Sequence, residues 1–357
     1  MKSPPDSPLP LARDGLLQKL LAQNPIRPIL TLLNGDNSWL ISIPYARPGP
    51  NGKHFVHLLL DPWLTGPQPG PLAGIIIHLT RIATPAYGTM DAIYRLISDI
   101  ENSAAVGKGG TGEAQVAPKH ILDGVIVADG GLDHLVHDTL IQIDRSVPVF
   151  CTPEVEFVIS SWNHFDTIVR LPDFVPGKDT SWPRGSLKHL PQSLSIFRLP
   201  DVHATIGKIH FAVIFAFSGN AAGNGALGDS SSLKEAILYS PHGTACSTID
   251  AAWAARPEET SMAAMLHGLS RTGLPFRSAR NTGALSGFKL HDIVEPKYWV
   301  RTHDDAQEYW GVLSSIMVYE TPTWEEAIAQ ERKETGVLRA VNPRFVEVGN
   351  GMSFIAE

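Results

Sequence analysis

Short apolar runs separated by turn residues recur along the whole chain, and each has a length that suits a buried β-strand. In the first half they occupy residues 29–33, 39–43, 54–61, 75–80 and 121–128. In the second half they occupy residues 193–200, 208–217, 235–241 and 296–301. Helical patterns accompany the strands in both halves. This arrangement predicts an α/β protein whose two strand-rich halves form a four-layer αββα sandwich.

Three segments carry patterns typical of helices. Residues 91–101 space their isoleucines and leucine at intervals of three and four, as one face of a helix requires. Residues 251–269, rich in Ala, Met and Leu, are expected to be helical as well. Residues 323–334 predict a late helix, with Thr323 as N-cap and two glutamates in the first turn.

The chain is predicted to have one main domain. Residues 1–28 are expected to be an N-terminal extension, with a proline-rich start and a short amphipathic stretch. Residues 29–357 are assigned to a single domain, because apolar strand patterns resume directly after each interruption. Two such interruptions, near 102–119 and 218–232, are poor in bulky apolar residues and are expected to be loop excursions.

Composition narrows the possible functions. With 43% hydrophobic and 18% charged residues among 357, the chain fits a soluble globular protein. Its net charge is −7 and no basic run exceeds two residues, which argues against nucleic acid or a membrane surface as a partner. Cys151 and Cys246 form neither a disulfide framework nor a CxxC site. Without a secretory signal or a membrane-spanning run, we expect a cytoplasmic location.

Candidate chemistry is concentrated after the apolar run that ends near residue 128. A glycine-containing loop follows it, with Asp129, Gly131 and then the pair Asp133-His134. Side chains at the carboxyl end of a strand are held by rigid backbone, which suits a functional site. Carboxylate and imidazole groups are ligands for zinc, iron or manganese.

This loop resembles the HxHxDH motif of the metallo-β-lactamase superfamily. Asp133 and His134 match its last two positions, whereas Asp129 replaces the first histidine and Gly131 the second. Other segments are similar to the same superfamily in consistent order, including GDNSWLISIP, LLLDPWLTG, EAILYSPHG, LHGLSRTGLP and PKYWVRTHDD. The last three resemble a fungal and bacterial branch. The resemblance implies a metallo-β-lactamase-like sandwich with a partly altered metal motif.

The resemblance also implies a set of metal ligands. His303 matches the family's final histidine, His242 stands where many members have the metal-bridging aspartate, and His203 is the candidate for the mid-chain histidine. One site would then keep only Asp129 and His203. The other would keep Asp133, His134 and His303, with His242 nearby. Three or four such ligands suffice for one divalent cation, with zinc favoured and iron or manganese as alternatives. We therefore predict one metal or none, and not a dinuclear centre.

Other residues have competing interpretations. Asp61 either orders the motif loop from below or is a turn residue, and Asp304 either orients a ligand or is a solvated charge. Asp133 could instead cap a following helix. His137 is expected to be an exposed helix residue, and His78 and His267 to be structural.

The sequence leaves three functions open. GxSxG, P-loop and HExxH motifs are absent. The first hypothesis is a metal-assisted hydrolase of a small ester, thioester or lactone, with Asp133 and His134 as catalytic residues; the fungal resemblance suggests secondary metabolism as its context. The second is a non-hydrolytic lyase, isomerase, cyclase or oxidoreductase with one or no metal. The third is a non-catalytic binding protein. A small molecule is the expected partner in each case, and the oligomeric state is open.

Overall fold

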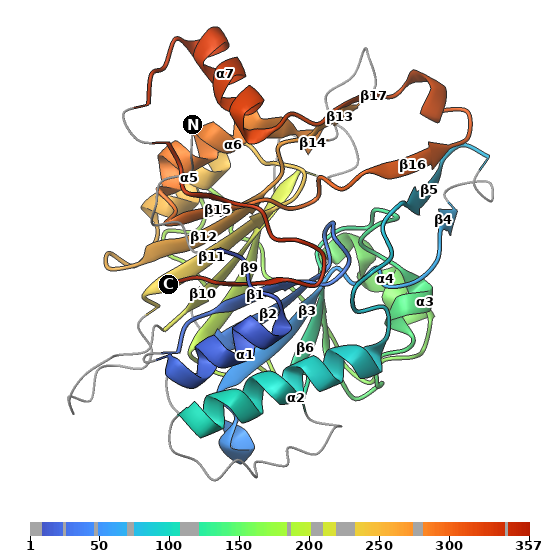
Figure 1. Cartoon of the computed structure of the whole chain (residues 1–357), viewed down its shortest axis with the longest axis vertical. Coiled ribbons are helices and arrows are strands. Elements are labelled where there is room, and N and C mark those ends of the chain that lie inside the picture. Colours follow the sequence, from blue (N-terminus) through green and yellow to red (C-terminus); the bar gives the residue numbers. More distant parts are fainter. Residues whose placement is uncertain are drawn as a thin grey trace.

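Two β-sheets packed face to face form the centre of the molecule (Figure 1). The computed structural model describes residues 9–23, 26–45, 49–69, 75–107, 121–183, 187–200, 210–218, 233–273, 281–339 and 342–357. Side chains of both sheets fill the space between them, among them Leu58, Ile126, Phe215 and Ile237. Because both sheets bury apolar residues on this shared face, neither is stable alone.

The first sheet joins antiparallel and parallel halves. Its strands, in spatial order, are β19 (Ser353–Ile355), β1 (Ile29–Leu32), β2 (Trp39–Pro44), β3 (Phe55–Leu60), β6 (Gly124–Val127), β7 (Val149–Cys151) and β8 (Ile168–Arg170). The pairs from β19 to β3 are antiparallel, and those from β3 to β8 are parallel.

The second sheet has the same mixed construction. Its strands, in spatial order, are β18 (Phe345–Val346), β15 (Tyr298–Val300), β12 (Ser261–His267), β11 (Glu235–Ser240), β10 (Phe211–Phe217) and β9 (Leu194–Pro200). The strands from β18 to β11 run parallel, and β9, β10 and β11 pair antiparallel. Parallel strands bring the loops that follow them to one edge of a sheet.

Helices cover the outer face of each sheet. Those on the first sheet are α1 (Arg13–Ala22), α2 (Met90–Gly107), α3 (His137–Leu140) and α4 (Pro153–Ser161). Those on the second are α5 (Cys246–Ala254), α6 (Gly283–Val294) and α7 (Trp324–Thr335). In Figure 1, α1 and α2 lie on one side of the paired sheets, and α5, α6 and α7 on the opposite side. The predicted four-layer αββα sandwich is confirmed.

Two small sheets extend the sandwich. One contains β16 (Gln307–Trp310), β5 (His78–Arg81) and β4 (Gln68–Pro69). The other contains β14 (Asn281–Thr282), β13 (Arg271–Gly273) and β17 (Val318–Glu320). Single 3-10 turns lie at Pro50–Gly52 and Ser314–Ile316. Figure 1 shows β4, β5 and β16 beside the end of the central sheets where α3 and α4 lie.

Two secondary-structure predictions need correction. Residues 251–269 are not one helix, because α5 ends at Ala254 and residues from Ser261 onward form the buried strand β12 between β11 and β15. Small side chains at Ala263 and Ala264 fit that crowded sheet as well as they fit a helix. Of residues 75–80, only those from His78 onward form a strand, β5 of the small β16-β5-β4 sheet, and Ile75 is exposed.

The ends of the predicted segments also shift. Helix α2 continues to Gly107, so the first six residues of the expected loop excursion at 102–119 are helical, and 108–119 lie outside the described residues. Residues 219–232 lie outside them too. Within the N-terminal extension, α1 packs on α2 through Leu16 and Leu20. The predicted helix at 323–334 is confirmed as α7, with a capping box between Thr323 and Glu326.

No helix in the part of the chain that the structure describes is long and apolar enough to span a bilayer.

Candidate metal centre

Five loops meet at one edge of the sandwich. The loop after β6 carries Asp133 and His134, the loop after β11 carries His242, and the loop after β15 carries His303. All three follow strands of the parallel halves, so their positions are fixed by the two sheets. Asp36 after β1 and Asp61 after β3 come from the first sheet to the same edge.

Three histidine rings converge at this edge. The ring centroids of His134, His242 and His303 lie 4.8–5.2 Å from one another. One nitrogen from each ring lies within 4.8 Å of the other two, which makes the group a possible metal site. All three residues are buried. Buried imidazoles from three separate loops seldom cluster without a shared ligand, because each ring needs polar partners.

Each ring is oriented by an oxygen acceptor on its Nδ1 side. The acceptors are Asp61 Oδ2 at 2.6 Å from His134, Asn281 Oδ1 at 2.6 Å from His242, and Asp36 Oδ2 at 3.3 Å from His303. An acceptor at Nδ1 holds a proton on that nitrogen, so Nε2 is the atom through which each ring can bind a cation once it has lost its own proton. The three rings therefore present Nε2 as a ligand atom.

The Nε2 atoms fit a cation well. Those of His134 and His242 are buried and make no hydrogen bond within the described residues. Three nitrogens bound tetrahedrally at about 2.0–2.1 Å from zinc lie roughly 3.3 Å apart, so small ring rotations bring this cluster into coordination. A divalent cation would give both nitrogens a bond in place of the hydrogen bond that neither of them makes within the described residues.

Two carboxylates border the histidine cluster. Asp133 Oδ2 lies 3.2 Å from His303 Nε2 and 3.8 Å from His134 Nε2. Asp129 Oδ2 lies 3.1 Å from His242 Nε2. Both come from the motif loop recognised in the sequence, so that loop supplies one imidazole and two carboxylates to the centre.

The electric field of the site favours positive charge. Burial lowers the pKa of His134, but the carboxylates of Asp61 and Asp133 outweigh it and raise that pKa to about 10. At His303, burial again lowers the pKa, but the carboxylate of Asp36 outweighs burial, so the pKa of His303 is raised above its ordinary value. At His242 burial dominates and lowers the pKa to about 4. Negative charge thus surrounds a pocket in which one imidazole is already neutral.

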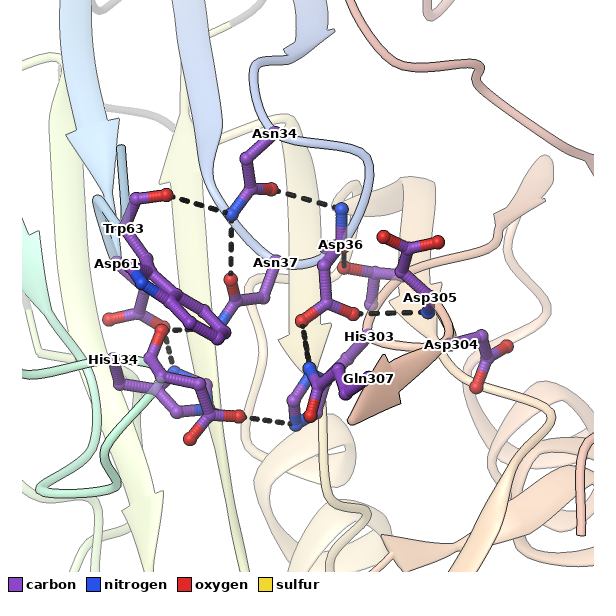
Figure 2. A network of polar contacts seen from close by, with 12 residues as sticks. Asn34, Asp36, Asn37, Asp61, Trp63, His134, His303, Asp304, Asp305 and Gln307 are labelled. Carbon is purple, nitrogen blue, oxygen red and sulfur yellow. Dashed lines mark hydrogen bonds and ion pairs between the residues drawn. The ribbon is translucent and has the colours of Figure 1, made fainter. Parts of the chain in front are cut away.

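Asp36 organises the side of the cluster around His303 (Figure 2). Its Oδ2 accepts hydrogen bonds from His303 at 3.3 Å and from Gln307 Nε2 at 2.7 Å, and its Oδ1 accepts one from the backbone of Asp305 at 3.2 Å. Asp36, Asp133 and His303 form a second possible metal group. Because protein donors already engage both Asp36 oxygens, this carboxylate serves as an anchor for His303.

Asp61 supports the motif loop from below, as one of the two sequence interpretations has it. Its Oδ1 accepts from the backbone of Ala128 at 2.7 Å, and its Oδ2 accepts from Tyr239 at 2.9 Å. The same Oδ2 faces His134 Nδ1 (Figure 2). Asp61 and His303 both have positive φ, 43° and 59°. Such strained backbone persists only where surrounding contacts enforce it, and it is common at functional sites.

Asp304 follows His303 directly in the sequence, but it does not orient the His303 ring. Its carboxylate accepts from the backbones of Leu269 and Ser270, at 2.6 and 2.8 Å, and pairs with Arg301. Asp304 thereby ties the loop after β12 to the loop after β15. The carboxylate that orients His303 is Asp36, 267 positions away in sequence.

Several other candidates are also placed. His203 lies outside the described residues. Helix α3 begins at His137 with Val136 as N-cap, so Asp133 does not cap it. His137 is half exposed and contacts Asp138. His267 is buried and bonds to the carbonyls of Ser240 and Gly283, in line with a structural role.

Sequence reasoning missed three residues of this centre. They are Asp36, Asn281 and Tyr239, and each acts through another residue. Asp36 lies in the GDNS turn that the resemblance already singled out, which was a usable signal. Asn281 and Tyr239 carried none, because an amide or a hydroxyl in an ordinary segment has no spacing that links it to a metal site.

A cleft of about 380 Å³ reaches the centre from the side of Asp36 and His303. Its remaining lining is strongly charged and includes Arg301, Asp304, Asp305 and Glu347.

Comparisons with known proteins identify the architecture. No family model and no curated protein sequence matches the chain. Among solved structures, a possible metal-dependent hydrolase from Veillonella parvula DSM 2008 superposes with a TM-score of 0.54 at 12% identity, covering 92% of this chain and 99% of that one. An isothiocyanate hydrolase from Delia radicum gut bacteria gives 0.48 at 11% identity, with 91% and 98% covered. This chain shares the fold of the Veillonella protein, an αββα sandwich.

Proposed function

We propose that the chain is a metal-dependent hydrolase that holds one divalent cation between His134, His242 and His303. The observation that carries the proposal is the shared geometry of the three rings, with Nδ1 engaged by an acceptor and Nε2 directed inward. The description of the Veillonella protein as a possible metal-dependent hydrolase agrees with it. Zinc suits an all-imidazole set best, with iron and manganese as alternatives.

One cation fits the ligand supply better than two. The two possible groups share His303, and Asp36 faces that ring at Nδ1. A ring that binds a cation through Nε2 keeps its Nδ1 proton for Asp36, so it cannot serve both groups. Three neutral nitrogens also leave a coordination position open, which a catalytic centre needs and a closed structural site lacks.

Bound there, a divalent cation would polarise a carbonyl oxygen and lower the pKa of a water molecule. The chain's own residues would do the remaining work. Asp133, beside two of the three Nε2 atoms, is placed to accept a proton from the attacking water and to return it to the leaving group. Asp61, Asn281 and Asp36 hold the rings in register during that transfer.

A small ester, thioester or lactone is the substrate class we propose. Secondary metabolism is its proposed context on the basis of the sequence resemblance. A cytoplasmic location agrees with two cysteines that are both unpaired in the structure.

A turnover assay with matched variants tests this function. The purified chain is loaded with one equivalent of zinc, cobalt or manganese and assayed against aryl esters, thioesters and lactones. We expect turnover that EDTA removes and metal restores. Asp133→Asn should lower kcat by about 10²–10⁴-fold, the usual contribution of general base catalysis, with metal content unchanged. His137→Ala, an exposed histidine beside the site, is the matched control and should retain full activity.

Two outcomes would contradict the proposal. Turnover that persists without metal would assign the chemistry to acid–base groups alone. A metal-loaded chain that turns over no member of these classes would favour a non-hydrolytic reaction on the same scaffold.

A further inference from the structure

Arg81, the last residue of β5, is half-buried, and two of its guanidinium nitrogens lack the hydrogen bonds that buried donors ordinarily make. Its Nε and Nη1 atoms are buried and make no hydrogen bond, and no ion pair of Arg81 occurs within the described residues. Burial lowers the pKa of Arg81 to about 10, against the opposite effect of Asp36 and Asp305, so the group stays charged at neutral pH. Buried charged donors without an acceptor are costly and call for a missing partner.

The guanidinium is held in place by a rigid aromatic platform. Its central carbon lies 4.6 Å from the ring centroid of Trp63, which is fully buried. The indole is fixed in turn, since its Nε1 donates to the carbonyl of Gly66 and its backbone N–H donates to Ser38 Oγ. A cation–π contact of this kind engages no N–H group in a hydrogen bond to an acceptor, so the donors of Arg81 remain available to an oxygen ligand.

The β-ladder places Arg81 beside the metal centre. Arg81 is paired with Gln307 across the antiparallel β5–β16 pair, so both side chains leave the same face of that sheet. Directly opposed side chains begin about 4.5–5.5 Å apart. Gln307 donates to Asp36, which faces His303 (Figure 2). Arg81 is therefore one cross-strand step from a residue that contacts the centre.

A second arginine near the centre gives a useful contrast. Arg301 lines the cleft at Asp36 and His303, but carboxylates already engage it, with Asp304 at its Nε and Glu347 at its Nη1. The two arginines differ in whether their guanidinium donors are engaged by acceptors of the protein. Arg301 is used within the protein, whereas Arg81 keeps an unoccupied pair of donors.

We infer that Arg81 is a specificity-determining residue that binds a carboxylate of the substrate, so that the hydrolysed molecule is an acid carrying its reactive ester, thioester or lactone a short distance from that carboxylate. This role rests on the proposed function. The planar guanidinium matches the two oxygens of a carboxylate. A monoanion suits the site better than a phosphate dianion, since Asp36 and Asp305 lie close enough to affect Arg81 electrostatically.

Binding of paired thiol probes to the cobalt-loaded chain tests the inference without turnover. The probes are mercaptoacetate, 3-mercaptopropionate and 4-mercaptobutanoate, each compared with its neutral amide, and the sulfur-to-cobalt absorption band gives Kd. We expect at least one acid to bind about tenfold to a hundredfold more tightly than its amide, the usual range for a hydrogen bond to a charged group. Arg81→Gln should remove this preference and leave the amide Kd within about twofold.

Arg81→Lys separates direct contact from general charge. It keeps the positive charge and loses the planar fork, so the inference expects most of the preference to disappear. A preference retained in Arg81→Lys would overturn the direct contact, and equal losses for acid and amide in Arg81→Gln would reduce Arg81 to a structural residue. Equal binding of acids and amides by the wild type would overturn the inference alone. Failure to take up cobalt would contradict the proposed function and this role with it.

Discussion

Two buried clusters of histidines and carboxylates flank the same strand, and they differ in whether their atoms are satisfied. At the start of β3, Glu101 of α2 accepts hydrogen bonds from the backbones of His54 and Phe55 and contacts both His54 and His57. The other nitrogen of His57 contacts Ser42 Oγ at 2.9 Å. Among the described residues, no buried side-chain nitrogen or oxygen of Glu101, His54 or His57 is left without a hydrogen-bond partner. Just after β3 ends, Asp61 belongs to the metal centre, where two buried imidazole nitrogens make no hydrogen bond.

The difference separates a cluster whose buried polar atoms are all engaged within the protein from one that can take a ligand. At the Glu101 end every charge is met within the protein, so the cluster joins α2 to the first sheet and has no capacity for a ligand. At the centre all three Nδ1 atoms face an acceptor, whereas the Nε2 atoms of His134 and His242 make no hydrogen bond within the described residues, an arrangement that favours binding of a cation. Residue type alone would not distinguish these two clusters.

Replacing one histidine of each cluster by alanine should change a different quantity in each case: cobalt affinity for His303 and the free energy of unfolding for His57. His303→Ala should weaken cobalt affinity by more than the roughly 10–100-fold typical of an outer-sphere change, with little loss of stability in the metal-free chain. His57→Ala should leave cobalt affinity unchanged and lower the free energy of unfolding by about 1–3 kcal/mol, because Glu101 and Ser42 lose a buried partner. Cobalt titration and urea denaturation measure the two quantities. If both variants changed cobalt affinity and the free energy of unfolding in the same way, the two clusters would not differ as described.

Substitution of Asp36 and of Asp304, one at a time, tests which of the two carboxylates orients His303. Asp36→Asn should weaken cobalt affinity about 10–100-fold, since the ring loses its charged Nδ1 acceptor. Asp304→Asn should leave that affinity unchanged and lower the unfolding midpoint, because its partners are two backbone N–H groups and Arg301. The reverse result would restore Asp304 as the orienting residue.

The Glu101 cluster predicts a pH dependence of stability. Burial alone would raise the pKa of Glu101, but hydrogen bonds from His54 and His57 outweigh it and hold that pKa far below its ordinary value. Its folded-state pKa lies below the unfolded value of about 4.3, so the stabilisation is complete above that pH and is lost as the pH falls below it. Glu101→Gln should cost about 1–3 kcal/mol at pH 7 and flatten the dependence between about pH 5 and pH 3. A dependence as steep as in the wild type would contradict this assignment.

The smallest effect is expected at Tyr239. Its hydroxyl donates to Asp61 at 2.9 Å, which leaves that carboxylate well placed toward His134. Tyr239→Phe removes one hydrogen bond of about 0.5–1.5 kcal/mol, so cobalt affinity should fall no more than about tenfold. A loss as large as that of His303→Ala would mean that Tyr239 itself contacts the cation.

The layers of the fold could be predicted from the chain, because apolar runs of strand length and the capping residues of α7 are local signals. The strand β12 was misassigned because Ala and Met favour helices locally, and only its place between β11 and β15 decides the outcome. At the site, Asp133, His134, His242 and His303 followed from motif position. Asp36 reaches the centre through a side-chain contact between loops, and Arg81 lies opposite Gln307 across a ladder; no local pattern encodes either placement.

The metal stoichiometry of the wild-type chain tests the central claim most directly. Protein purified without chelators, then titrated with zinc against a competing chromophoric chelator, should bind one equivalent tightly. His134→Ala and His242→Ala should each abolish that binding, whereas His137→Ala should retain it. Two tight equivalents, or one equivalent that survives both alanine variants, would show that the three imidazoles are not the metal site.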